Sequence, residues 1–85
     1  MSETILGIEA GGTRTSVIVA NAQGELIHQR TLGPGNFRVI GKEGLSALLK
    51  DCASIARRPA RVGLGMAGVR DDRDRKWILN EAHKI

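Results

Sequence analysis

The stretch that decides the fold spans residues 7–15 and reads GIEAGGTRT. It lies between two runs rich in β-branched and other apolar side chains, residues 4–9 and residues 15–20. Such runs are typical of β-strands, and a pair of glycines between them indicates a tight turn. Residues 4–20 are therefore predicted to form two antiparallel strands joined by a short glycine turn.

The residue types around this turn suit a bound phosphate group. Glycines let the backbone approach a bulky anion, and successive N–H groups in a tight turn form a concave site of positive potential. Thr13 and Arg14 add a hydroxyl donor and a charged donor, and Glu9 at the strand end is placed to hold a hydrated Mg²⁺. The spacing matches neither GxxxxGK[ST] nor GxGxxG.

The alternative is a β-hairpin in which the two glycines only satisfy a primed turn, with Thr13 and Arg14 as surface residues. Glu9 favours the phosphate site over this alternative. We expect it on a buried side of an otherwise apolar strand, where an acid without a role would be costly.

The rest of the chain alternates turn signals with apolar runs. Asn-Ala-Gln-Gly at 21–24 predicts a turn into a third strand over 25–32, and Gly-Pro-Gly-Asn at 33–36 predicts a loop. Apolar residues at helical spacing predict a helix over 41–57, which Pro59 ends. Val62, Leu64 and Met66 predict a fourth strand, and an acidic cap at Asp71 or Asp72 begins a second helix that runs to the last residue.

This element order predicts an α/β fold. A strand that follows a helix after an antiparallel meander usually pairs parallel to an earlier strand through a right-handed crossover. The first strand is the natural partner. We therefore expect a βββαβα half-lobe: a mixed four-stranded sheet of order 3-2-1-4 with two helices.

Composition indicates the cellular compartment and the classes of ligand that the protein is expected to bind. The 85 residues allow one small domain, and the single cysteine, Cys52, favours a reducing compartment, so we expect a cytoplasmic protein without a membrane segment. The net charge of +4 could attract nucleic acid, but the arginines are scattered from Arg14 to Arg75 rather than clustered. His28 and His83 lack neighbours at metal-ligand spacing, so no transition-metal site is expected.

Residues 7–15 resemble the first phosphate motif of the actin, hexokinase and Hsp70 superfamily, D-x-G-G-T-[KR]-[TS]. They are most similar to the BadF/BadG/BcrA/BcrD-type ATPase family and its N-acetylglucosamine kinase members, in which the acid can be Glu, as at Glu9. The likeness extends along the chain. Residues 21–27 resemble the family's second turn, residues 33–37 its loop with an essential asparagine, and residues 62–68 its G-L-A-G strand. Ala10 departs from the pattern, because a glycine often stands there.

The resemblance implies an RNase H-like, actin-like ATPase fold and an ATP-dependent kinase that transfers the γ-phosphate to an amino-sugar hydroxyl. ATP and Mg²⁺ would be the cofactors, and the amino sugar the partner. Gly11, Gly12 and Thr13 would contact the ATP phosphates, with Arg14 as a further candidate. Glu9 would lie near the Mg²⁺.

Asn36 matches the sugar-contacting asparagine of the family. The alternative is an asparagine that tolerates the left-handed conformation in a Gly-Pro-Gly turn. In the family the aspartate that serves as general base follows the last helix seen here. Residues 1–85 are therefore expected to be an N-terminal subdomain that carries no catalytic residue and is inactive alone.

Other functions stay open. An RNase H-like nucleic-acid enzyme of the resolvase type shares the βββαβα order and an acid on its first strand, although such nucleases need several carboxylates around two metals. The sequence places none at residues 66–68, where the fourth strand ends. A non-catalytic module that dimerises through a sheet edge is a third possibility. ATPases that couple hydrolysis to electron transfer usually carry D-x-G-S-T and cluster-binding cysteines. Glu9, Gly12 and the lone Cys52 disfavour them.

Overall fold

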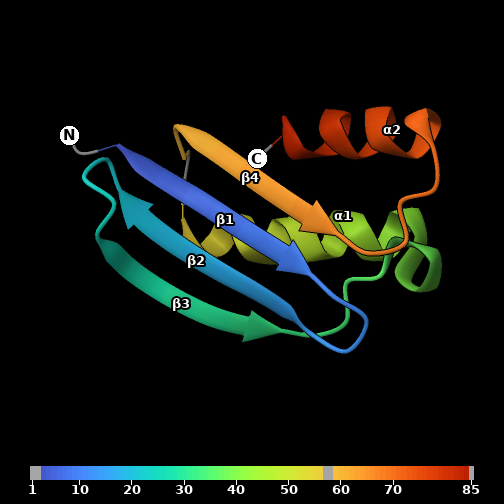
Figure 1. Ribbon diagram of the computed structural model, residues 1–85, viewed down its shortest axis with the longest axis horizontal. Helices are drawn as coiled ribbons and strands as arrows, with labels where there is room; N and C mark the ends of the chain where they lie inside the picture. The colour runs from blue at the N-terminus through green and yellow to red at the C-terminus, as the bar shows by residue number, and fades with distance from the viewer. Residues whose placement is uncertain (1–2, 57–58, 85) are drawn as a thin grey trace.

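The computed structural model describes residues 3–56 and 59–84. Its sheet has the order β3-β2-β1-β4, with β1 antiparallel to β2 and parallel to β4 (Figure 1). This arrangement confirms the predicted topology. The elements are β1 (Thr4–Ala10), β2 (Thr15–Asn21), β3 (Leu26–Leu32), α1 (Phe37–Ile55), β4 (Arg61–Met66) and α2 (Asp72–Ala82).

The core lies between one face of the sheet and the two helices. Side chains alternate along a strand, so Leu6, Ile8 and Ala10 of β1 point to the covered face and are buried. In Figure 1 α1 lies behind the sheet, and the face toward the viewer carries no helix. The buried core consists of Leu6, Ile8, Ala10, Val17, Val19, Phe37, Leu45, Leu48, Leu49, Cys52, Ala56 and Ile78.

Helix α1 begins earlier than the sequence pattern predicts. It starts at Phe37 rather than at residue 41, and it is interrupted at Gly41, where φ is 66° and ψ is −172°. Glycine adopts this left-handed φ without the steric cost that other residues incur. The regular helix thus resumes at Lys42, one residue after the predicted start. It ends at Ile55, and the predicted end at 57 lies outside the described residues.

Helix α2 begins as predicted, with Asp71 as its N-cap. The Asp71 side chain accepts a hydrogen bond from the backbone N–H of Asp74 at 3.0 Å. The helix packs on the core through Ile78 and through Trp77, whose ring stacks on Phe37 with centroids 5.9 Å apart. The last regular residue is Ala82, and residue 85 lies outside the described part of the chain. Neither described helix combines the length and the hydropathy that crossing a bilayer requires.

The buried thiol of Cys52 gives the protein a predictable response to alkali. Burial raises the pKa of Cys52 from 9.0 to about 11, and the neighbouring Asp51 carboxylate adds to the rise. The native state therefore favours the protonated thiol, and this contribution to stability is complete below pH 9 and lost as pH rises toward 11. We expect the free energy of unfolding to fall across that window by up to about 1.4 kcal/mol per pH unit.

The measurement is urea unfolding at a series of pH values for the wild type and for Cys52→Ala. The sequence contains no tyrosine, so no phenol titrates in the same window. Lysines titrate in both proteins, and the difference between the two slopes isolates the thiol. Equal slopes would contradict the assignment of the raised pKa to Cys52.

Candidate functional site

Three loops meet at the end of β1. They are the β1–β2 turn at residues 11–14, the loop at residues 33–36, and residues 67–68 after β4 (Figure 1). The N–H of Gly35 donates to the carbonyl of Gly11 at 2.8 Å, and the N–H of Phe37 donates to Ala67 at 2.9 Å. The N–H of Ala67 in turn donates to Ala10 at 2.9 Å. Backbone hydrogen bonds therefore join all three loops at one end of the sheet.

Two glycines make this close packing possible. A Cβ at Gly35 would overlap the Cβ of Ala10 and lie 2.6 Å from Oγ1 of Thr15. Gly68 has φ +85°, and a Cβ there would overlap Oδ1 of Asn36. Both positions therefore exclude any side chain in this arrangement.

Thr15 is an anchor that the sequence analysis did not single out. It is completely buried at the start of β2, and its hydroxyl donates to the carbonyl of Gly33 at 2.9 Å. This bond fixes the 33–36 loop over the β1–β2 turn. The sequence gives one signal for this role. Thr15 is the first of the alternating residues of β2 that point to the buried face, followed by Val17 and Val19.

The β1–β2 turn is closed by the N–H of Gly11, which donates to the carbonyl of Arg14 at 2.9 Å. Neither Gly11 nor Gly12 is among the glycines with positive φ. A primed hairpin turn needs a positive φ at its first central residue, here Gly12. The hairpin alternative in its primed form is therefore wrong.

Gly12 is not required by its neighbours either. Apart from Gly12 and its two neighbours in the chain, no described atom lies within 4 Å of the position that a Cβ would take there. The side chains of Thr13 and Arg14 are exposed beside it. The turn thus presents open backbone, a hydroxyl and a cation to solvent, which is an arrangement that can receive an anion.

Glu9 does not lie on a buried side of its strand. It is exposed, on the face of the sheet opposite the helices, because it alternates with the buried residues Ile8 and Ala10. The expectation that Glu9 lies on a buried side is therefore wrong, and the cost of burying an unpaired acid does not apply to this residue.

The carboxylate of Glu9 borders a hollow of about 260 Å³. The hollow is lined by Gly7, Ile8, Glu9, Ser16, Ile18 and Gly63. Among the described residues, the carboxylate of Glu9 forms no hydrogen bond or ion pair, so its oxygens are open to water and to a hydrated cation.

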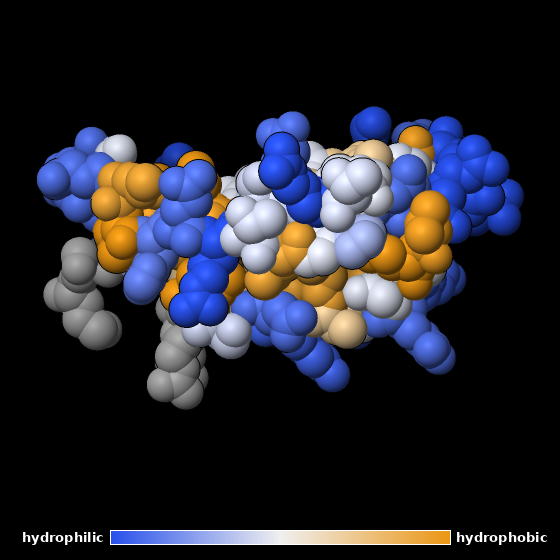
Figure 2. Space-filling model, turned by 90° about the horizontal axis from the view of Figure 1, so that it is seen from below, coloured by the Kyte–Doolittle hydropathy of each residue, from blue (hydrophilic) through white to orange (hydrophobic). Residues whose placement is uncertain are grey.

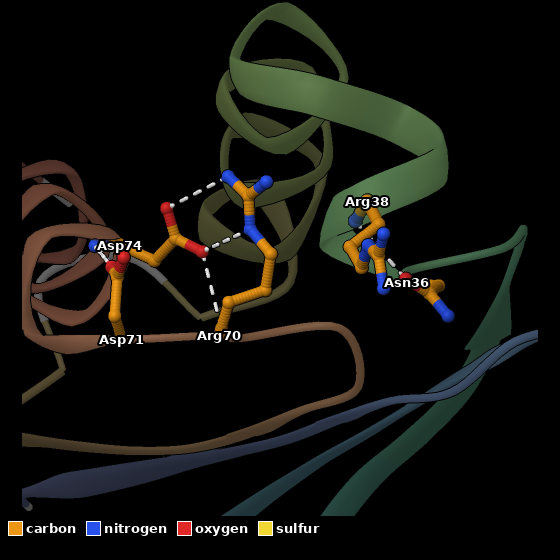
Figure 3. Close-up of polar contacts among 5 residues, drawn as sticks. All are labelled: Asn36, Arg38, Arg70, Asp71 and Asp74. Atoms are coloured by element: carbon orange, nitrogen blue, oxygen red, sulfur yellow. Dashed lines mark hydrogen bonds and ion pairs between the residues drawn. The ribbon is translucent and has the colours of Figure 1, made fainter.

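Asn36 serves as the N-cap of α1. Its Oδ1 accepts a hydrogen bond from the backbone N–H of Arg38 at 3.0 Å (Figure 3). Its φ of −68° and ψ of 116° are extended, so the left-handed alternative is wrong. In Figure 3 the amide nitrogen of Asn36 points away from Arg38. The capping role thus uses the oxygen and leaves the amide donors on the side away from the helix.

The backbone is similar to two solved structures. One is the Aquifex aeolicus PPX-GPPA enzyme, with a TM-score of 0.62 and 13% identity over 98% of this chain and 34% of that chain. The other is T. thermophilus RuvC in complex with Holliday junction substrate, with a TM-score of 0.52 and 16% identity over 96% of this chain and 56% of that chain. The fold is RNase H-like. Neither a protein-family model nor a curated protein matches the sequence.

The chain corresponds to about a third of the length of the first structure and just over half of the length of the second. The likeness confirms the predicted fold class, including the half-lobe order that the actin-like ATPases share. The likeness does not test membership of the BadF/BadG/BcrA/BcrD-type family, which stays a prediction from residues 7–15. In this RNase H-like sheet, the predicted phosphate turn and the loop that carries Asn36 are direct neighbours.

Proposed function

We propose that this chain is the phosphate-binding part of an ATP-dependent sugar kinase. The transfer would carry the γ-phosphate of ATP to an amino-sugar hydroxyl. One observation supports this most: the exposed β1–β2 turn, in which Gly12 is needed neither for its dihedral angles nor for packing. A bulky anion approaching the backbone would explain the glycine. The likeness to the PPX-GPPA enzyme supports the fold that the sequence motif implies, and the motif itself supports the kinase assignment.

The roles of the residues follow from their positions. The backbone N–H of Gly12 and the hydroxyl of Thr13 would hold the phosphates, while Arg14 would offset their charge. Gly11 would shape the turn rather than donate to the phosphates, because its N–H already donates to the carbonyl of Arg14. Glu9 would hold a hydrated Mg²⁺ through water, because its carboxylate is exposed and monodentate contacts through water suit that ion. ATP would supply the transferable phosphoryl group. This chain contributes positioning and charge stabilisation, which are the main sources of catalysis in phosphoryl transfer.

Gly12→Ala should separate binding from folding. The added methyl group enters open space at a residue without positive φ, so the free energy of unfolding should stay within about 0.5 kcal/mol of the wild type. The same methyl group would block an anion from the backbone, and losing one charge-assisted hydrogen bond should weaken Mg²⁺-ATP binding about tenfold or more. The measurement is an amide-resolved NMR titration with Mg²⁺-ATP.

The matched control is Gly33→Ala, which also adds a methyl group in open space. It should bind Mg²⁺-ATP as the wild type does. Saturable shifts confined to residues 11–14 in the wild type would support the proposal. A folded chain whose amides do not respond, or a Gly12→Ala variant that binds normally, would contradict it.

Substitutions of Asn36 should distinguish its cap from a sugar contact. Asn36→Ala removes the acceptor for the Arg38 N–H and should cost about 1 kcal/mol of stability. Asn36→Asp keeps an equally good cap but lacks the amide donors, so stability should be nearly unchanged. If the amide contacts the amino sugar, both variants should lose the response to N-acetylglucosamine. Urea unfolding and NMR titration measure the two properties, and normal sugar binding by Asn36→Asp would limit this residue to capping.

The second candidate is an RNase H-like nucleic-acid enzyme. It is favoured by the likeness to RuvC in complex with a Holliday junction substrate and by the net charge of +4. A gel-shift comparison of a four-way DNA junction with linear duplex at physiological salt separates the two functions. Junction-selective binding, together with no response to Mg²⁺-ATP, would favour this candidate.

A further inference from the structure

A second hollow lies where the start of α1 meets the start of α2 and the residue Arg70 before it. Its volume is about 360 Å³. It shares no residue with the β1–β2 turn or with the hollow beside Glu9. The lining residues are Phe37, Arg38, Gly41, Lys42, Arg70 and Asp74.

The lining of this hollow carries excess positive charge. Three cations, Arg38, Lys42 and Arg70, line the hollow together with one carboxylate, Asp74, which leaves a net charge of +2 (three minus one). Hydrogen bonds from the side chain and backbone of Arg70 lower the pKa of Asp74, so this carboxylate stays ionised at neutral pH.

Asp74 is already committed to Arg70. The guanidinium of Arg70 donates to both carboxylate oxygens, at 3.0 Å from Nε and 3.3 Å from Nη2, and the Arg70 backbone N–H donates at 3.1 Å (Figure 3). Within residues 3–56 and 59–84, no ion pair involves Arg38 or Lys42. The ammonium of Lys42 instead lies 5.2 Å from the centre of the Trp77 ring. Neither cation is thus held in an ion pair in the described chain, and the charge of Lys42 contributes to the lowered pKa of Asp74.

The interruption of α1 adds to this positive potential. The helix resumes at Lys42, immediately after the kink at Gly41, and both residues line the hollow. The first N–H groups of a helix and the positive end of its dipole favour anions at its beginning. Charged side chains and the helix start therefore act at the same hollow.

We propose that this hollow binds a phosphate group, either as free phosphate or as the phosphoryl group of a small ligand. Phosphate is close to a dianion at neutral pH, which matches the net charge of +2 better than a carboxylate does. Arg38 can donate two parallel hydrogen bonds to it, and Lys42 can act as a point charge. The site differs from the one proposed for ATP, and this inference does not depend on the kinase assignment.

Trp77 provides a direct readout. It is the only tryptophan in the sequence, and Lys42 lies over its ring. An anion that draws Lys42 away should change the emission of Trp77. Titration of the chain with inorganic phosphate at constant ionic strength should give a saturable change, while acetate and chloride should give none. An equal response to all three anions would reduce the effect to general screening and would overturn the proposal.

Variants tie the signal to the hollow. Arg38→Gln should weaken phosphate binding about tenfold, because it removes a charged donor. Lys42→Gln should do the same, but it alters Trp77 emission by itself, so the amide shifts of residues 38–41 replace fluorescence there. Arg30→Gln removes one charge on β3 and should bind phosphate normally. Unchanged affinity in both hollow variants would contradict the proposal.

Two further measurements secure the interpretation. Thermal unfolding of each variant establishes that it is folded under the conditions of the titration. Gly12→Ala should keep the full Trp77 response, because the β1–β2 turn is a separate site. Loss of that response in Gly12→Ala would place the phosphate at the turn and overturn the assignment to the hollow.

Discussion

Replacing Gly35 with alanine is expected to lower the free energy of unfolding by roughly 3 kcal/mol, the upper part of the usual range for overpacking. The new Cβ would overlap the Cβ of Ala10 and come within 2.6 Å of the Thr15 hydroxyl. The two neighbours belong to adjacent strands, so neither can move without disturbing the sheet. Urea unfolding followed by Trp77 fluorescence measures the change.

Gly33→Ala is the matched control for this prediction. It lies in the same loop, its Cβ would meet no described atom within 4 Å, and it should leave stability nearly unchanged. If Gly35→Ala were as stable as Gly33→Ala, the loop would not pack on the β1–β2 turn as described. The description of the three loops as packed together at one end of the sheet would then also be wrong.

Leu45→Ala is expected to destabilise the protein by about 3 to 4 kcal/mol, because it removes a large side chain from a filled core. Leu45 lies on α1, is completely buried and belongs to the cluster between that helix and the sheet. A small domain buries a modest share of its surface and has little stability to lose. We expect a lower urea midpoint with an unchanged slope.

Val39→Ala tests whether the loss at Leu45 reflects burial. Val39 is also an aliphatic residue of α1, but 75% of its surface is exposed. It should change stability by no more than about 0.5 kcal/mol. Similar losses in the two variants would mean that α1 presents a different face to the sheet.

Much of the fold follows from local patterns in the chain. The paired glycines at 11–12 and the turn at 21–24 divide the first third of the sequence into strands that the structure confirms. The crossover rule then places β4 beside β1, because a parallel partner was needed and β1 was the natural one. Asp71 was recognisable as a cap because acids follow it in the first helical turn.

The start of α1 could not be read from periodicity. Phe37 and Ile40 begin a helical turn that Gly41 breaks, and the regular apolar spacing appears only afterwards. The orientation of Glu9 was missed for a related reason. Residues 4–10 are almost continuously apolar, which is typical of a strand buried on both faces, whereas both helices pack on a single face here.

The candidate site was predictable in its parts and not in its assembly. The glycine turn and Asn36 stand out in the sequence, but their contact depends on Gly35 lying against Ala10 and on the bond from Thr15 to Gly33. Such contacts join residues far apart in the chain, and one sequence carries no direct sign of them. The cationic hollow was missed because its residues come from two segments about thirty positions apart.

The turn between β2 and β3 lies at the opposite end of the sheet from these loops (Figure 1). Asn21 closes it through its own backbone and side chain, which bond to Gln23, Gly24 and Glu25. On the β3 side of the molecule, which faces the viewer in Figure 2, apolar surface alternates with polar groups rather than forming one continuous band. Because the turn lies at the opposite end of the sheet from these loops, it is a suitable place to insert an affinity tag or a fluorophore. An insertion there would leave both proposed anion sites undisturbed, so that binding could be followed in a labelled protein.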